Sequence, residues 1–215
     1  MDLSRPIGTV SPTIDADVLA LLASSDIAFT GRQVHRVLGR HSQTGVNRVL
    51  NRLVHEGIVA RTTAGSAHTY VLNHEHLQAG AVLELARARE RLVERLTKTM
   101  DEWQDDPHFA ALYGSAASGQ HSDHSDIDLF IVRPDDVRED DERWTENLLE
   151  LRALVARWTG NDCETVEMST DEVEEAFANE DPFIRSVGRQ MIVFVGQGSY
   201  LRRGVQRRLK KPTNG

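Results

Sequence analysis

The chain is poor in cysteine and has no long hydrophobic run. Its 215 residues include one cysteine, Cys163, which excludes an internal disulfide and a zinc site built from several cysteines. No apolar run approaches the roughly 20 residues that a membrane-spanning helix needs. The first residues include Asp2, Arg5 and Pro6 and lack the apolar segment of a signal peptide. We therefore expect a soluble, cytoplasmic protein with no membrane partner.

The formal net charge of -8 is unevenly distributed along the chain. Residues 1–80 carry 7 basic against 6 acidic side chains, and residues 81–100 carry 5 against 3. Residues 101–191 carry 7 against 24, whereas residues 192–215 carry 6 against none. This division predicts units with different partners, and the acidic segment is not expected to contact nucleic acid unless metal ions intervene.

Residues 1–78 show the signals of a small helical domain. The apolar spacing of Ile14–Leu22 predicts a short amphipathic helix. Thr30 and Gln33 form a capping box that starts a helix at Gly31. Ser42 can cap a third helix, whose apolar face consists of Val46, Leu50, Leu53 and Val54. Two short strands, Ile58–Arg61 and His68–Leu72, follow as a hairpin.

The segment FTGRQVHRVLGRHSQTGVNRVLNRLVHEGIVARTTAGSAHTYVLN resembles the winged helix-turn-helix family over about 45 residues. The resemblance implies that the third helix enters the major groove of double-stranded DNA, where amide and guanidinium groups read purine edges and arginines neutralise phosphates. The candidate DNA-binding residues are Arg32, Gln43, Thr44, Asn47, Arg48 and Arg52. Winged helices also serve as dimerisation or docking modules, so a homodimer stays open.

The apolar spacing within residues 79–106 predicts a connecting helix. Leu85, Leu92, Leu96 and Met100 lie near helical spacing, and Pro107 follows the segment. We expect one long helix that links the two domains or pairs with its copy in a dimer.

The chemistry is concentrated after residue 107. An apolar run, Phe109–Tyr113, ends at Gly114 and Ser115, and a strand begins at Asp126. Asp126 and Asp128 share one face of that strand, with Cα atoms roughly 6 to 7 Å apart. Two carboxylates at this spacing can reach divalent cations, which serve displacement reactions at phosphorus.

The run LYGSAASGQHSDHSDIDLFIV resembles the nucleotidyltransferase superfamily related to DNA polymerase beta, and it looks most like the small, minimal members. The match covers about residues 107–198 and implies an α+β domain with a small mixed sheet flanked by helices. It also implies Mg²⁺ or Mn²⁺ and a nucleoside triphosphate, with ATP expected. Gly114, Ser115 and Ser118 would bind the nucleotide, and Asp126 and Asp128 the metal.

The resemblance implies a third acidic residue on a later strand, which we place at 164–168. Glu167 is the preferred catalytic and metal-binding residue, and Glu164 is the competitor. Glu167 could ligate a metal or help to deprotonate the acceptor hydroxyl.

Small members of the superfamily often carry a basic residue after Gly-Ser, but this chain has Ala116, Ala117 and Ser118. The cation could come instead from Arg133 or from the basic tail within residues 199–215. That tail contains Arg202, Arg203, Arg207, Arg208, Lys210 and Lys211. His121 and His124 are expected to be solvated loop residues.

Two functions follow. One is metal-dependent transfer of a nucleoside monophosphate to a hydroxyl of a small molecule, a protein or an RNA end, coupled to a DNA-binding module. The alternative is a DNA-binding transcriptional regulator whose nucleotidyltransferase-like domain senses a nucleotide or docks a partner without turnover.

Overall fold

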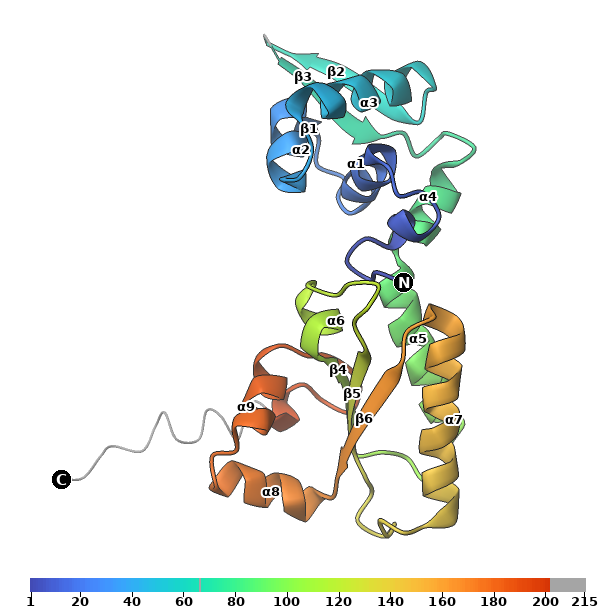
Figure 1. Cartoon of the computed structure of the whole chain (residues 1–215), viewed down its shortest axis with the longest axis vertical. Coiled ribbons are helices and arrows are strands. Elements are labelled where there is room, and N and C mark those ends of the chain that lie inside the picture. The colour runs from blue at the N-terminus through green and yellow to red at the C-terminus, as the bar shows by residue number, and fades with distance from the viewer. Residues whose placement is uncertain (66, 202–215) are drawn as a thin grey trace, which may run out of the picture. The chain divides into compact units, whose positions relative to one another are not determined.

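The computed structural model describes residues 1–65 and 67–201, which form two compact units (Figure 1). The first unit contains Asp2 and Ser4–Ala88, and the second contains Met1, Leu3 and the residues from Arg89 onward. The six basic residues of the predicted tail lie outside the described residues. No helix in the described part of the chain is both long enough and apolar enough to cross a membrane.

The first unit combines helices with a three-stranded antiparallel sheet of order β1-β3-β2. The helices and the hairpin expected from the sequence are confirmed, whereas the short strand β1 was not predicted. The elements are the 3-10 helix η1 (Pro6–Thr9), α1 (Ile14–Ala23), β1 (Phe29–Thr30), α2 (Gly31–Leu38), α3 (Gln43–His55), β2 (Val59–Ala64), β3 (Ala67–Leu72) and α4 (Ala79–Ala86).

Local capping fixes the turn between α2 and α3. Thr30 and Gln33 form the predicted capping box, and Gly39 ends α2 in the left-handed conformation with φ 66°. The Ser42 side chain then accepts a hydrogen bond from the backbone N–H of Gly45, which caps α3. Each cap satisfies backbone groups that a helix end leaves unpaired, so these residues set where both helices begin.

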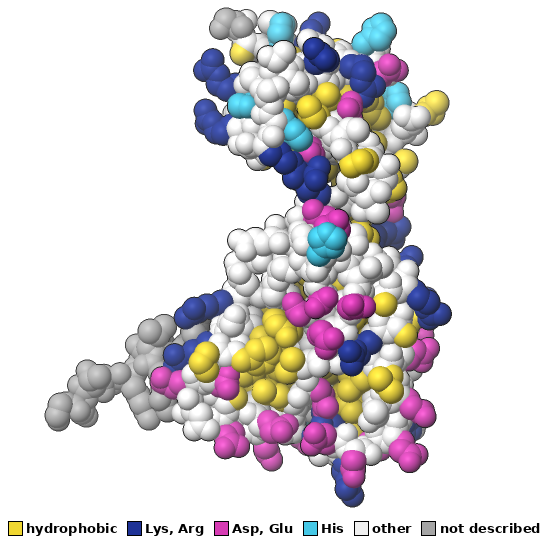
Figure 2. All heavy atoms as spheres, in the orientation of Figure 1, with side chains coloured by type: hydrophobic (Ala, Val, Ile, Leu, Met, Phe, Trp, Pro, Cys, Tyr) yellow, Lys and Arg dark blue, Asp and Glu magenta, His cyan; other side chains and the backbone are white. Residues whose placement is uncertain are grey.

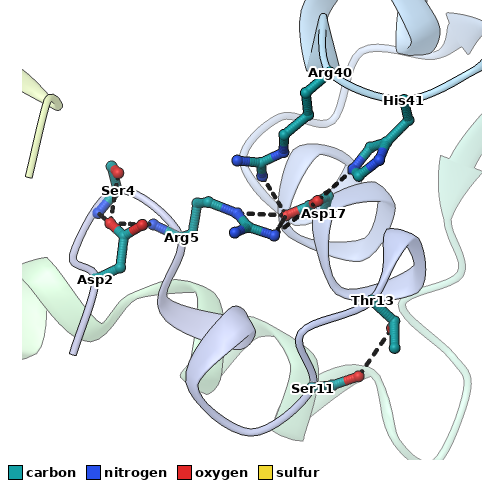
Figure 3. A network of polar contacts seen from close by, with 8 residues as sticks. All are labelled: Asp2, Ser4, Arg5, Ser11, Thr13, Asp17, Arg40 and His41. Atoms are coloured by element: carbon teal, nitrogen blue, oxygen red, sulfur yellow. Dashed lines mark hydrogen bonds and ion pairs between the residues drawn. The ribbon is translucent and has the colours of Figure 1, made fainter. Parts of the chain in front are cut away.

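A buried carboxylate, Asp17 on α1, is surrounded by basic side chains (Figure 3). It accepts hydrogen bonds from Arg5 at 3.0 Å and from Arg40 at 2.5 Å, and His41 Nε2 lies 2.6 Å away. Burial favours the neutral acid, but the hydrogen bonds from His41 and Arg5 and the charge of Arg40 outweigh it and lower the pKa of Asp17. This network ties α1 to the segment before it and to the turn between α2 and α3.

The second unit is a four-stranded mixed sheet of order β6-β5-β4-β7, in which only the β5–β6 pair is parallel. Helices α5 and α7 cover one face, and α8 and α9 cover the other (Figure 1). The elements are α5 (Ala88–Asp101), β4 (Phe109–Tyr113), α6 (Gly114–Ser118), β5 (Ile127–Val132), α7 (Glu142–Thr159), β6 (Cys163–Met168), α8 (Thr170–Ala178), α9 (Pro182–Arg189) and β7 (Ile192–Val195).

The prediction of a single connecting helix over 79–106 is wrong, because the backbone leaves helical geometry at Arg87 (φ -92°, ψ 22°). Val82 and Leu83 of α4 pack against the core of the first unit. Leu92 and Leu96 of α5 belong to the core of the second unit. The apolar stripe that resembled one helix therefore serves two separate cores.

We predict that Asp17→Asn lowers the free energy of unfolding by about 1–3 kcal/mol at pH 7, because two arginines lose a charged hydrogen-bond partner. Since the folded pKa of Asp17 is lowered, its contribution is complete above the ordinary aspartate pKa of about 3.9 and is lost as the pH falls through the folded value. Urea unfolding of the wild type and the variant between pH 3 and pH 7 measures both effects.

Asp15→Asn on the same helix is the matched control, because Asp15 makes a more exposed ion pair with Arg52. We expect its cost to stay below about 1 kcal/mol. Equal costs for the two variants at pH 7 would contradict the central role of the Asp17 network.

Candidate functional site

The end of strand β4 brings a glycine against a carboxylate. Tyr113 pairs with Asp128 across the antiparallel β4–β5 ladder, and Gly114 then turns the chain with φ 67°. A Cβ atom at Gly114 would lie 2.4 Å from Asp128 Oδ2, well inside contact distance. Glycine is therefore required here both for its backbone conformation and for the space that Asp128 occupies.

Asp126 directly precedes β5, which begins one residue later than the sequence predicts, and Asp128 shares a face of this strand with Phe130 and Val132. Ile127, Leu129 and Ile131 are fully buried on the opposite face, which confirms the alternation. Burial raises the pKa of Asp128, and the negative charges of Asp126 and Glu164 raise it further. Within residues 1–65 and 67–201, no hydrogen bond or ion pair from a basic side chain reaches either aspartate.

The register of the parallel β5–β6 pair separates the two candidates for a third carboxylate. Glu164 lies opposite Asp128, and parallel register places both side chains on the same face. Glu167 lies opposite Ile131, on the other face, where it forms a largely buried ion pair with Arg133. Glu164, and not Glu167, therefore shares the face of Asp128.

The short helix α6 follows Gly114 directly and carries the other predicted nucleotide-binding residues. Ser115 and Ser118 are both half-buried, and the Ser118 hydroxyl donates to the Ser115 carbonyl oxygen at 3.2 Å. Ala116 is buried in the core. Gly114, Ser115 and Ser118 therefore lie on one turn beside Asp128.

The two histidines of the loop after α6 have different environments. His124 is exposed, as expected. His121 is 3% exposed, and its Nδ1 accepts a hydrogen bond from the backbone N–H of Leu3 at 3.3 Å. The expectation that His121 is solvated is wrong, because the N-terminal segment covers it.

An apolar patch adjoins the carboxylates. Figure 2 shows acidic side chains gathered beside exposed hydrophobic atoms on the second unit. The half-buried hydrophobic residues on this face of the sheet include Tyr113, Val166, Met168, Phe177 and Phe183. The rings of Tyr113 and Phe183 pack edge to face, with centroids 5.5 Å apart. Sequence reasoning missed this patch, because its members come from four separate elements.

Tyr113 and Cys163, which lie near the carboxylates, both remain uncharged at neutral pH. Burial raises the pKa of Tyr113 to about 12, and the negative charges of Asp128 and Glu164 add to the effect. Burial also raises the pKa of Cys163 to about 12, so its thiol is not a nucleophile at neutral pH.

The chemistry of Asp126 and Asp128 fits a magnesium ion. Among the residues that the structure describes, no three His, Cys, Asp or Glu side chains are gathered closely enough to form a complete cage. Mg²⁺ is commonly held by one or two carboxylates together with substrate phosphates and water. Asp126 and Asp128 supply two such carboxylates, and the raised pKa of Asp128 indicates uncompensated negative charge.

The six candidate DNA-binding residues lie in the first unit. Arg32, Thr44, Asn47, Arg48 and Arg52 are exposed, and Gln43 is half-buried. The Gln43 amide donates to Asn47 Oδ1 at 3.1 Å, and the Arg52 guanidinium pairs with Asp15. All except Arg32 lie on α3, so the structure places them along one helix.

Comparison with known proteins supports the assignment of the second unit. Residues 94–179 match the family described as Polymerase beta, Nucleotidyltransferase, and this range includes α6, Asp126, Asp128 and Glu164. The chain thus contains a nucleotidyltransferase-type domain. No curated protein matches the chain.

Solved structures give more distant matches. A chain of a structure described as the toxin-antitoxin with AMP-PNP is 18% identical, with 56% of this chain and 86% of that chain covered and a TM-score of 0.36. A chain of a mutant toxin-antitoxin MntA-HpeT structure is 15% identical, with 54% and 86% covered and a TM-score of 0.37.

We predict that Asp128→Asn stabilises the metal-free protein at pH 7. The raised pKa means that the fold resists ionisation of Asp128, so this penalty is absent below about pH 3.9 and complete above the folded pKa. Urea unfolding in EDTA should therefore show a higher midpoint for the variant, with the difference vanishing at low pH. Added Mg²⁺ should stabilise the wild type and leave the variant unchanged. A lower midpoint for the variant in EDTA at pH 7 would contradict this electrostatic account.

Proposed function

We propose that the second unit transfers a nucleoside monophosphate from a nucleoside triphosphate, with ATP the expected donor, to a hydroxyl group. The acceptor oxygen bonds to the α-phosphorus, the bond from that phosphorus to the bridging oxygen breaks, and pyrophosphate leaves. The observation that carries this proposal is Asp128, held against Gly114 and within the field of Asp126, with no basic partner for either carboxylate in the described part of the chain. The family match over residues 94–179 supports it.

Three sets of groups would act on the nucleotide. Gly114 lets the backbone approach the phosphates closely, and the Ser115 and Ser118 hydroxyls lie on the same turn as hydrogen-bond donors. Asp126 and Asp128 would hold Mg²⁺ or Mn²⁺, with Glu164 as the third carboxylate in place of Glu167. When bound, such an ion neutralises phosphate charge and stabilises the oxygens of the displacement. The protein's contribution is mainly positioning.

The acceptor would be a small molecule, a protein or an RNA end. The apolar patch around Tyr113 and Phe183 adjoins the carboxylates and could seat either the base or the acceptor.

For the first unit, we propose binding of double-stranded DNA as a winged helix-turn-helix. The element order, the sheet of order β1-β3-β2 and the exposed polar face of α3 support this assignment. The second candidate for the whole protein is a regulator in which the transferase-like domain senses nucleotide without turnover. It is favoured by one observation, namely that α6 itself carries no basic residue.

We predict that the purified protein transfers label from at least one α-labelled nucleoside triphosphate in cell lysate with Mg²⁺ or Mn²⁺, and that Asp126→Asn with Asp128→Asn abolishes the transfer. Glu164→Gln should lower the rate by about tenfold or more, as for other groups that tune a metal site. Glu167→Gln is the matched control, and its rate per folded molecule should stay within about twofold of the wild type, because its carboxylate faces Arg133.

The reverse order of the two glutamate variants would restore Glu167 as the third carboxylate. Binding of nucleotide and metal by the wild type without any transferred label would favour the sensor over the enzyme.

We predict that Asn47→Ala with Arg48→Ala weakens binding to genomic DNA fragments by about tenfold or more, since both side chains are exposed on α3. The affinity of the wild type should fall steeply with salt, because phosphate contacts release counterions. Fluorescence anisotropy between 50 and 200 mM salt measures the DNA affinity of each protein and its dependence on salt. Arg157→Ala on α7 is the control and should retain the affinity of the wild type. Salt-independent or absent binding by the wild type would contradict the DNA-binding assignment.

A further inference from the structure

The proposed reaction creates a charge problem at α6. A nucleoside triphosphate carries several negative charges, and it would lie beside Asp126, Asp128 and Glu164. The helix that faces the phosphates offers Ala116, Ala117 and Ser118, none of which is basic. Metal ions offset part of this charge, but a basic side chain from another element would hold the triphosphate more firmly.

Of the two cation sources that the sequence suggested, the basic tail lies outside the described residues and Arg133 is committed elsewhere. Arg133 is 7% exposed and pairs with Glu167 on the face of the sheet opposite Asp128. Arg152 donates to the Cys163 carbonyl oxygen at 2.9 Å and lies 3.4 Å from Glu164. Neither side chain is free to meet a phosphate at α6.

Arg89, near the start of α5, is placed differently. Its Nη1 lies 4.0 Å from the position that a Cβ atom on Gly119 would take. Gly119 follows Ser118 and ends α6 in the left-handed conformation, so the guanidinium lies beside the last turn of this helix. Ser118 is hydrogen-bonded back to Ser115, and one helical turn of about 5.4 Å separates the two ends. An arginine side chain can span that distance.

The Arg89 side chain is also available. The residue is half-buried, and across residues 1–65 and 67–201 no hydrogen bond or ion pair engages its guanidinium. By contrast, Arg91 on the same helix pairs with Glu94 at 3.3 Å. A partly buried guanidinium without a carboxylate partner is suited to a phosphate, which matches its fork of donors.

We propose that Arg89 is a triphosphate-binding residue, supplied by α5 to the phosphate site at α6. This inference rests on the proposed function, because it requires a nucleoside triphosphate along the Gly114–Ser118 turn. On this proposal Arg89 meets the phosphates farthest from the sugar, so its loss should affect a triphosphate more than a monophosphate.

The test is fluorescence titration of the full chain with the four mant-labelled nucleoside triphosphates and their monophosphates in the presence of Mg²⁺. Arg89→Ala should weaken triphosphate binding by about tenfold or more, as expected for the loss of a charged hydrogen bond. Monophosphate binding should change by less than about twofold. The triphosphate affinity of Arg89→Lys should fall between those of the wild type and Arg89→Ala. Arg91→Ala should bind triphosphates like the wild type.

A rescue variant separates charge from structure. Ala117→Arg in the Arg89→Ala background places a guanidinium on α6 without removing a proposed nucleotide-binding hydroxyl, and it should restore at least part of the lost triphosphate affinity. Equal triphosphate affinity of the wild type and Arg89→Ala would overturn the role of Arg89 and leave the proposed function intact. Parallel loss of triphosphate and monophosphate binding without rescue would assign Arg89 a structural role only. No binding by the wild type would overturn the proposed function itself.

Discussion

The close approach of Gly114 to Asp128 is the constraint on which the candidate site depends. Because a Cβ atom at Gly114 would lie only 2.4 Å from Asp128 Oδ2, no larger residue fits without moving the carboxylate. The same glycine turns the chain from β4 into α6 with a positive φ. The pairing of β4 with β5, the turn into α6 and the position of the Asp128 carboxylate are thus fixed at one point.

The parts of the site that depend on one stretch of chain could be predicted, and the part that depends on strand register could not. Strand alternation predicts that Asp126 and Asp128 lie together, and the negative charge of Asp126 helps to raise the pKa of Asp128. The choice between Glu164 and Glu167 depends on how β6 aligns with β5, and the 18-residue helix α7 lies between these strands in the chain. Packing of α7 sets that alignment, and a shift of one residue would exchange the two faces.

The distinction between signals within one stretch of chain and contacts between distant stretches also explains which predictions were confirmed elsewhere in the chain. The starts of α2 and α3 follow from capping residues within four positions, and the sequence predicted them. The break at Arg87 has no comparable signal, since no proline or glycine marks it. It is recognisable only because Val82 and Leu92 pack into different cores. Tertiary packing therefore overrides a helical pattern that looks continuous.

Charge, and not cavity size, distinguishes the candidate site. A groove of about 510 Å³ lies between α5 and α7, on the face of the sheet away from Asp128, and its lining mixes Arg95 and Lys98 with Glu102 and Glu150. The positive and negative side chains of this lining offset one another's charge. Asp17 shows the same compensation in the first unit, where basic neighbours lower its pKa. Asp128 shows the opposite, because burial and two neighbouring carboxylates raise its pKa. A fold that keeps such a carboxylate ionised loses stability, and the loss is recovered only when a cation binds there.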